Sequence, residues 1–70
     1  MKSKNIKSLM IKNAFNQATL SEHLNISLQS LNLKLNGKRE FKESELISMA
    51  DLFKVTVDYL LEREDYWWQS

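Results

Sequence analysis

The segment that most restricts the fold of this chain is residues 16–38, NQATLSEHLNISLQSLNLKLNGK, where two short apolar patterns flank a polar turn. Leu20 and Leu24 are four residues apart and therefore share one face of a helix. The second pattern has i, i+3, i+7 spacing, with leucines at Leu28, Leu31 and Leu35. Both stretches predict short amphipathic helices whose leucines face inward.

The second of these helices has signals at both ends. Ser27 precedes it and is a good N-cap, because its hydroxyl can accept a hydrogen bond from the amide of Gln29 or Ser30. Gly37 is the only glycine of the chain and can take the left-handed conformation that ends a helix. Two helices joined by so short a turn predict a helix-turn-helix over about residues 16–37.

This segment resembles the helix-turn-helix of the phage repressor and Cro family, whose domain has the lambda-repressor-like fold. The resemblance rests on Asn16-Gln17 at the start of the first helix, the apolar spacing, Asn36-Gly37-Lys38 after the second helix, and the closing residues LFKVTVDYLL. It covers about residues 6–61. It implies an all-α bundle of about five helices containing the helix-turn-helix, with residues 1–70 forming a single domain.

Helical periodicity predicts three further helices, over about residues 5–14, 43–53 and 57–63. Thr56 is a suitable N-cap for the last of them, and Phe41 is expected to fold back from its loop as a plug. The residues expected to face inward from these helices are Ile6, Leu9, Met10, Leu46, Ile47, Ala50, Phe53, Leu60 and Leu61. No sustained alternation predicts a strand.

Composition excludes several classes of protein. The chain has 70 residues and no cysteine, which predicts one small domain without disulfides or thiolate metal ligands. We find no apolar run long enough for a membrane span and no apolar core of a signal peptide. His23 is the only histidine and lacks partners at ligand spacing, so we expect no metal, no cofactor and no enzymatic activity. The expected location is the cytoplasm of a bacterial host cell, at the nucleoid.

Charge is distributed unevenly along the chain. Residues 1–39 carry seven Lys or Arg against one Glu, a net charge of +6. Residues 40–70 carry three Lys or Arg against eight acidic residues, a net charge of −5. This asymmetry favours an orientation in which the basic half faces phosphate.

The resemblance directs the outward face of the helix near residues 28–35 into the major groove of a DNA operator. Asn and Gln side chains can bond adenine N6 and N7, and leucine can contact the thymine methyl group, which predicts readout of A·T pairs. Lys34 lies between Leu33 and Leu35, so the rotation of this helix stays open and either leucine can face inward. The residues expected to contact bases are Leu28, Gln29, Ser30, Asn32 and Leu33.

Phosphate contacts are expected to surround that helix. The resemblance assigns them to the start of the first helix, where free amides favour an anion, and to the loop after the second. The residues expected to contact phosphate are Asn16, Gln17, Ser27, Lys34, Asn36, Lys38 and Arg39.

The C-terminal residues 65–70 are rich in aromatic side chains. Adjacent tryptophans cannot both face the core of one helix, so they form a contact with another chain or fold back on the domain, and both alternatives stay open. The candidate interface residues are Val57, Leu61, Tyr66, Trp67 and Trp68.

Two functions are consistent with the sequence. One is a repressor-like or Cro-like transcriptional regulator of a phage lysogeny switch, binding double-stranded DNA, with a homodimer as one arrangement. The other is a small antirepressor that binds a cognate repressor protein.

Overall fold

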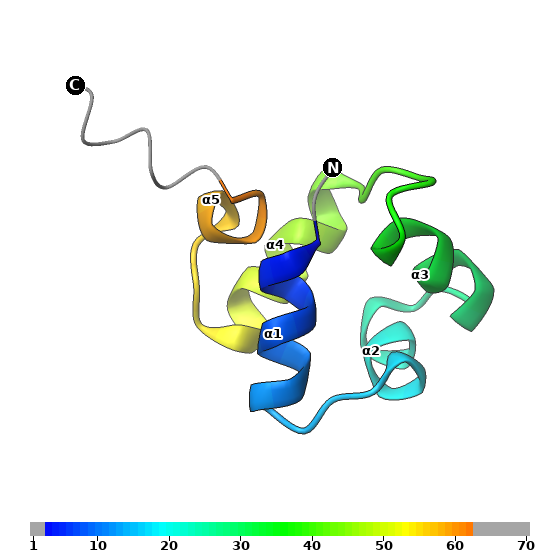
Figure 1. Cartoon of the computed structure of the whole chain (residues 1–70), viewed down its shortest axis with the longest axis horizontal. Coiled ribbons are helices and arrows are strands. Elements are labelled where there is room, and N and C mark those ends of the chain that lie inside the picture. The colour runs from blue at the N-terminus through cyan, green and yellow to red at the C-terminus, as the bar shows by residue number, and fades with distance from the viewer. Residues whose placement is uncertain (1–2, 63–70) are drawn as a thin grey trace.

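The computed structural model describes residues 3–62, and the regular secondary structure of this part of the chain consists of helices joined by short loops (Figure 1). Its five helices are α1 (Lys4–Lys12), α2 (Gln17–Leu24), α3 (Leu28–Leu35), α4 (Glu43–Phe53) and α5 (Val57–Leu60). α2 packs against α3 and α4, and α5 packs against α1 and α4. The predicted all-α class, with about five helices, is confirmed for these residues.

All five helices contribute to one hydrophobic core. One fully enclosed side chain comes from each helix in turn, namely Ile6, Leu20, Leu31, Met49 and Leu60. Phe41 is buried as well, which confirms that the loop between α3 and α4 folds back as a plug. The core therefore links the α2–α3 pair to the rest of the molecule.

Two of the predicted inward positions are wrong. Ile47 is 50% exposed, because α4 turns its Leu46, Met49 and Phe53 face inward and Ile47 lies about 100° away from Leu46. Leu28 is 51% exposed, because the first residue of α3 lies beyond the edge of the core.

Three polar side chains cap the starts of helices, and Ser27 and Thr56 do so as the sequence predicts. The Ser27 hydroxyl accepts from the Ser30 amide at 3.0 Å, and the Thr56 hydroxyl accepts from the Tyr59 amide at 3.0 Å. Asn16 caps α2 by accepting from the Thr19 amide at 2.8 Å. Such caps satisfy amide groups that have no partner within the helix.

The ends of the first four helices share a residue with positive φ. Ala14, Asn25, Gly37 and Lys54 all have positive φ and follow α1, α2, α3 and α4 respectively. In each case the next residue donates its amide to a carbonyl five residues back, with N···O distances of 2.7–3.0 Å. This is the Schellman arrangement, and it makes α1 end at Lys12 instead of near residue 14. α5 also ends earlier than predicted, at Leu60 instead of near residue 63, because Leu61 and Glu62 form a turn in which Glu62 has positive φ.

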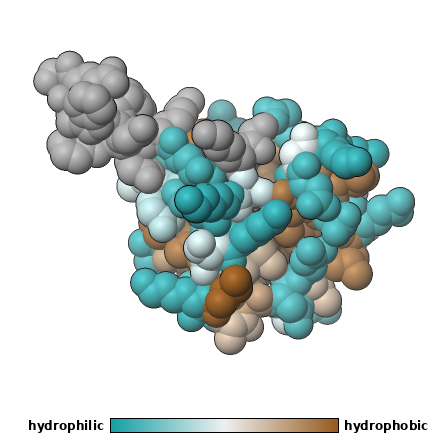
Figure 2. Space-filling model, in the orientation of Figure 1, coloured by the Kyte–Doolittle hydropathy of each residue, from teal (hydrophilic) through white to brown (hydrophobic). Residues whose placement is uncertain are grey.

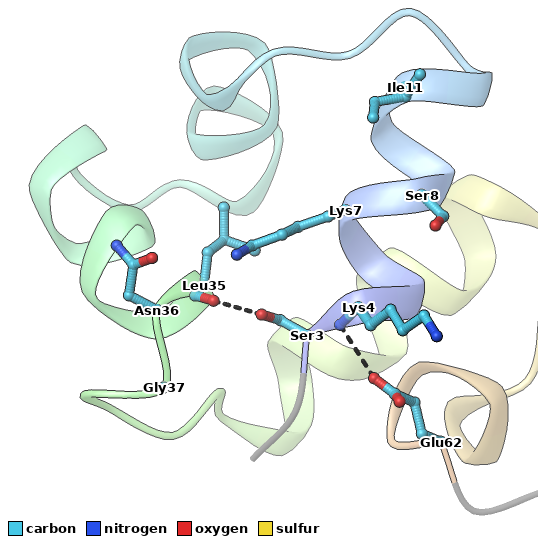
Figure 3. Close-up of a pocket in the computed structure, with 9 residues that line it drawn as sticks. All are labelled: Ser3, Lys4, Lys7, Ser8, Ile11, Leu35, Asn36, Gly37 and Glu62. Carbon is cyan, nitrogen blue, oxygen red and sulfur yellow. Dashed lines mark hydrogen bonds between the residues drawn. The ribbon is translucent and has the colours of Figure 1, made fainter.

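The N-terminus of α1 is tied to elements distant in sequence (Figure 3). The Glu62 carboxylate accepts from the amides of Lys4 at 3.0 Å and Asn5 at 3.4 Å, where it suits the positive end of the helix dipole. The Ser3 hydroxyl donates to the carbonyl of Leu35 at the end of α3. α1 is thereby held against both α5 and the end of α3.

Within residues 3–62, no helix combines the length and the apolar character needed to cross a membrane.

Candidate nucleic-acid interface

α3 has a buried side and an exposed side. Leu31, Lys34 and Leu35 are buried, while Gln29 and Asn32 are exposed. Among the other residues predicted to contact bases, Leu28 is exposed, and Ser30 and Leu33 are half-buried at the borders. The choice left open between Leu33 and Leu35 is thus settled, with Leu35 inward.

Lys34 does not lie where a phosphate contact needs it. Its ammonium is 2.6 Å and 2.8 Å from the two carboxylate oxygens of Glu45, and both side chains are more than 90% buried. The same ammonium lies 5.9 Å from the centre of the Phe41 ring. The structure therefore contradicts the prediction that Lys34 contacts phosphate, because its charge is neutralised inside the molecule.

Glu45 joins α3 to the start of α4. Besides binding Lys34, its carboxylate accepts from the Lys42 amide at 2.8 Å and so caps α4. Burial of Glu45 opposes its ionisation, but the hydrogen bonds from Lys34 and from the Lys42 backbone, with the charges of both lysines, outweigh it and lower its pKa. The carboxylate is therefore ionised at neutral pH and holds α3 at a fixed rotation.

A row of three side-chain amides crosses the exposed surface from α2 to the end of α3. Asn36 Nδ2 donates to Asn32 Oδ1 at 3.2 Å, and Asn32 Nδ2 donates to Gln17 Oε1 at 3.3 Å. All three residues were predicted from the sequence to contact DNA, but their contacts with one another were not. Only the packing of α2 against α3 brings Gln17 to Asn32, fifteen positions away.

The start of α2 presents polar groups beside this row. Asn16 and Thr19 form a reciprocal capping box, in which the backbone N–H of Asn16 also donates to the Thr19 hydroxyl at 3.0 Å. The cap uses the Asn16 side-chain oxygen and leaves its amino group as a donor. The half-buried Gln17 likewise accepts from Asn32 through its side-chain oxygen, so its amino group remains available as a donor. Both free amino groups are suited to a phosphate oxygen.

The loop after α3 supplies exposed positive charge. Asn36, Lys38 and Arg39 are all exposed, as the predicted phosphate contacts require. Ser27 is exposed too, and its hydroxyl proton stays available because the cap uses only its oxygen. Six of the seven predicted phosphate contacts thus have groups at the surface, and Lys34 is the exception.

Lys7 is a neighbour of this surface that sequence reasoning did not single out. It lines an open groove between α1 and the end of α3, together with Leu35, Asn36 and Gly37. Figure 3 shows its side chain crossing from α1 toward Leu35. No local pattern reveals this position, since it depends on how α1 packs beside α3.

The predicted interface with another chain is described only in part. Val57 and Leu61 are half-buried and pack against the core, whereas Tyr66, Trp67 and Trp68 lie outside the described residues. The face shown in Figure 2 is mostly hydrophilic, with small separate hydrophobic patches.

His23 is exposed on α2, and residues 3–62 contain no group of three or more His, Cys, Asp or Glu side chains that could hold a metal ion.

Comparison of the chain with protein-family models, with curated proteins and with solved structures finds no significant match.

Proposed function

We propose that this chain is a sequence-specific DNA-binding transcriptional regulator of the phage repressor and Cro type. In this proposal α2 and α3 act as a helix-turn-helix, and α3 enters the major groove of an operator. Binding of the chain excludes other proteins from the promoter and so represses transcription without chemistry.

The observation that carries the proposal is the composition of the two sides of α3. Its inward side is anchored by Leu31, Leu35 and the buried Lys34–Glu45 pair, so its rotation is fixed. Its outward side presents the amides of Gln29 and Asn32 beside the half-exposed leucine Leu28. These are side chains that can bond adenine and contact the thymine methyl group, each good bidentate pair contributing about 1–3 kcal/mol of discrimination.

The groups around α3 suit the phosphates on both sides of a groove. The start of α2 offers the amino groups of Asn16 and Gln17, next to helix amides that favour an anion. The loop after α3 offers the cations Lys38 and Arg39. Contacts of this kind set the register of a protein on DNA, while base contacts set its sequence preference.

The proposal is tested by selection from a library of random DNA duplexes with the purified chain. We expect enrichment of a motif containing A·T pairs. Gln29→Ala and Asn32→Ala should each lose preference at one base pair, at a cost of about 1–3 kcal/mol, while keeping salt-sensitive non-specific binding.

Ser48→Ala, on the exposed surface of α4, is the control variant and should enrich the same motif as the wild type. Failure of the wild-type chain to enrich any sequence would contradict the proposal. Binding to a cognate repressor protein would then be the function to test.

A further inference from the structure

We infer that Gln17 and Asn36 are positioning residues that restrict the motion of the Asn32 side-chain amide, so that Asn32 reads an adenine at one fixed position of the operator. This inference rests on the proposed function. It adds the residues that determine specificity and the base they select.

The hydrogen bonds connect Asn32 to one neighbour on each side. Asn32 accepts from the Asn36 amino group through Oδ1 and donates to the Gln17 oxygen through Nδ2. Turning the Asn32 amide over alone would place its amino group against that of Asn36 and its oxygen against that of Gln17. The reversed form therefore requires Gln17 and Asn36 to turn over as well, so the row couples the motion of Asn32 to that of both neighbours.

The groups that Asn32 retains match the edge of adenine. A side-chain amide has two N–H donors and an oxygen with two lone pairs. The contacts to Gln17 and Asn36 use one donor and one lone pair, so one of each remains. Adenine presents the N7 acceptor beside the N6 donor in the major groove, which is the complementary pair.

The gain from this arrangement is preorganisation. Asn32 is exposed, and an exposed amide without partners would have to be immobilised when it binds a base. Contacts from α2 on one side and from the end of α3 on the other order the side chain before DNA arrives. Asn36→Ala and Gln17→Ala should therefore change selectivity without removing the reading group itself.

The first part of the test uses the free protein. We expect ¹⁵N relaxation of the Asn32 side-chain amide to show an ordered group in the wild type and increased motion in Gln17→Ala and Asn36→Ala. Gln29→Ala, which alters an exposed amide of α3 outside the row, should leave the Asn32 signal unchanged. An Asn32 amide equally mobile in the wild type and in both row variants would overturn the inference.

The second part of the test measures base preference at the base pair where Asn32→Ala loses the preference of the wild type. Gln17→Ala and Asn36→Ala should each lower the preference for adenine there about two- to tenfold, the cost of immobilising one side chain. Gln17→Glu keeps an oxygen that can accept from Asn32 but adds negative charge. It should weaken binding to all duplexes while retaining the adenine preference at this pair.

The outcomes separate the inference from the proposed function. If the wild-type chain selects a motif and Asn32→Ala relaxes one base pair, but Gln17→Ala and Asn36→Ala retain that preference, the positioning role is wrong and DNA recognition stands. If the wild-type chain selects no sequence at all, the proposed function fails and the inference fails with it.

Discussion

The side chain of Lys34 fixes the rotation of α3. A lysine between two leucines left the inward residue undecided in the sequence, because lysine is rarely buried unless it is paired. Here Glu45, eleven residues further on, supplies the partner, and Lys34 turns inward with Leu35. The outward position of Asn32 is thus linked to an ion pair on the opposite side of its helix.

Loss of either member of this pair should destabilise the fold. Lys34→Met or Glu45→Gln each leaves a buried polar or charged group without its partner, at a cost of about 3–5 kcal/mol. The double variant Lys34→Met/Glu45→Gln removes both charges and keeps a side-chain oxygen to cap α4, so it should be more stable than either single variant. Urea unfolding followed by circular dichroism measures all four proteins. Single variants as stable as the wild type would show that the pair contributes nothing.

The same pair should make stability depend on acid pH. The pKa of Glu45 is lowered by folding from its ordinary value of 4.5, so the unfolded chain binds the proton more tightly. Its stabilising contribution is complete above that value and is lost as pH falls through the folded pKa. Unfolding free energies measured from neutral to acid pH should fall more steeply for the wild type than for Lys34→Met/Glu45→Gln. Equal slopes would contradict the role of Glu45.

At the scale of helices, the starts of elements were easier to predict than their ends. The caps Asn16, Ser27 and Thr56 act through their own side chains within three residues, so the local sequence suffices. Gly37 was also predictable, because glycine takes a positive φ at little cost. Ala14 and Lys54 take the same conformation against their preference, and nothing in their residue type indicates it.

This difference predicts a stabilising substitution at the end of α4. Lys54 has φ of 60°, where a residue with a Cβ atom is disfavoured by about 1–2 kcal/mol. Lys54→Gly removes that cost but raises the conformational entropy of the unfolded chain, which opposes folding. We therefore expect the free energy of unfolding to increase by about 0.5–1 kcal/mol. Thermal unfolding should show a melting temperature higher by several degrees.

Gly37→Ala is the reciprocal variant, since it places a Cβ atom at φ of 76°, and it should lower the melting temperature. A lower melting temperature for Lys54→Gly would contradict the account of how α4 ends.

The contacts between elements account for most of what the sequence did not reveal. The exposed face of α3 follows from its own periodicity, apart from the rotation that Lys34 decides. The row from Gln17 through Asn32 to Asn36, and the place of Lys7 beside α3, depend on how α2 and α1 pack. Residues distant in sequence meet there, and no local spacing encodes their meeting.

At the scale of the whole molecule, the Lys34–Glu45 pair connects the basic part of the chain, residues 1–39, to the acidic part, residues 40–70. The pair neutralises one charge of each part inside the core. The exposed cations Lys38 and Arg39 lie just beyond the end of α3. Positive charge at the surface is therefore available beside the helix that we propose to read the bases.

The central claim is that α3 and its flanking groups form the surface that binds DNA. Titration of the ¹⁵N-labelled chain with a DNA duplex at low salt, followed by NMR chemical shifts, tests it most directly, because weak non-specific binding is enough to be seen. The account predicts shifts concentrated at Leu28, Gln29 and Asn32, at the start of α2 and at Lys38 and Arg39. Shifts centred on the exposed surface of α4 around Ile47, or no shifts at all, would contradict it.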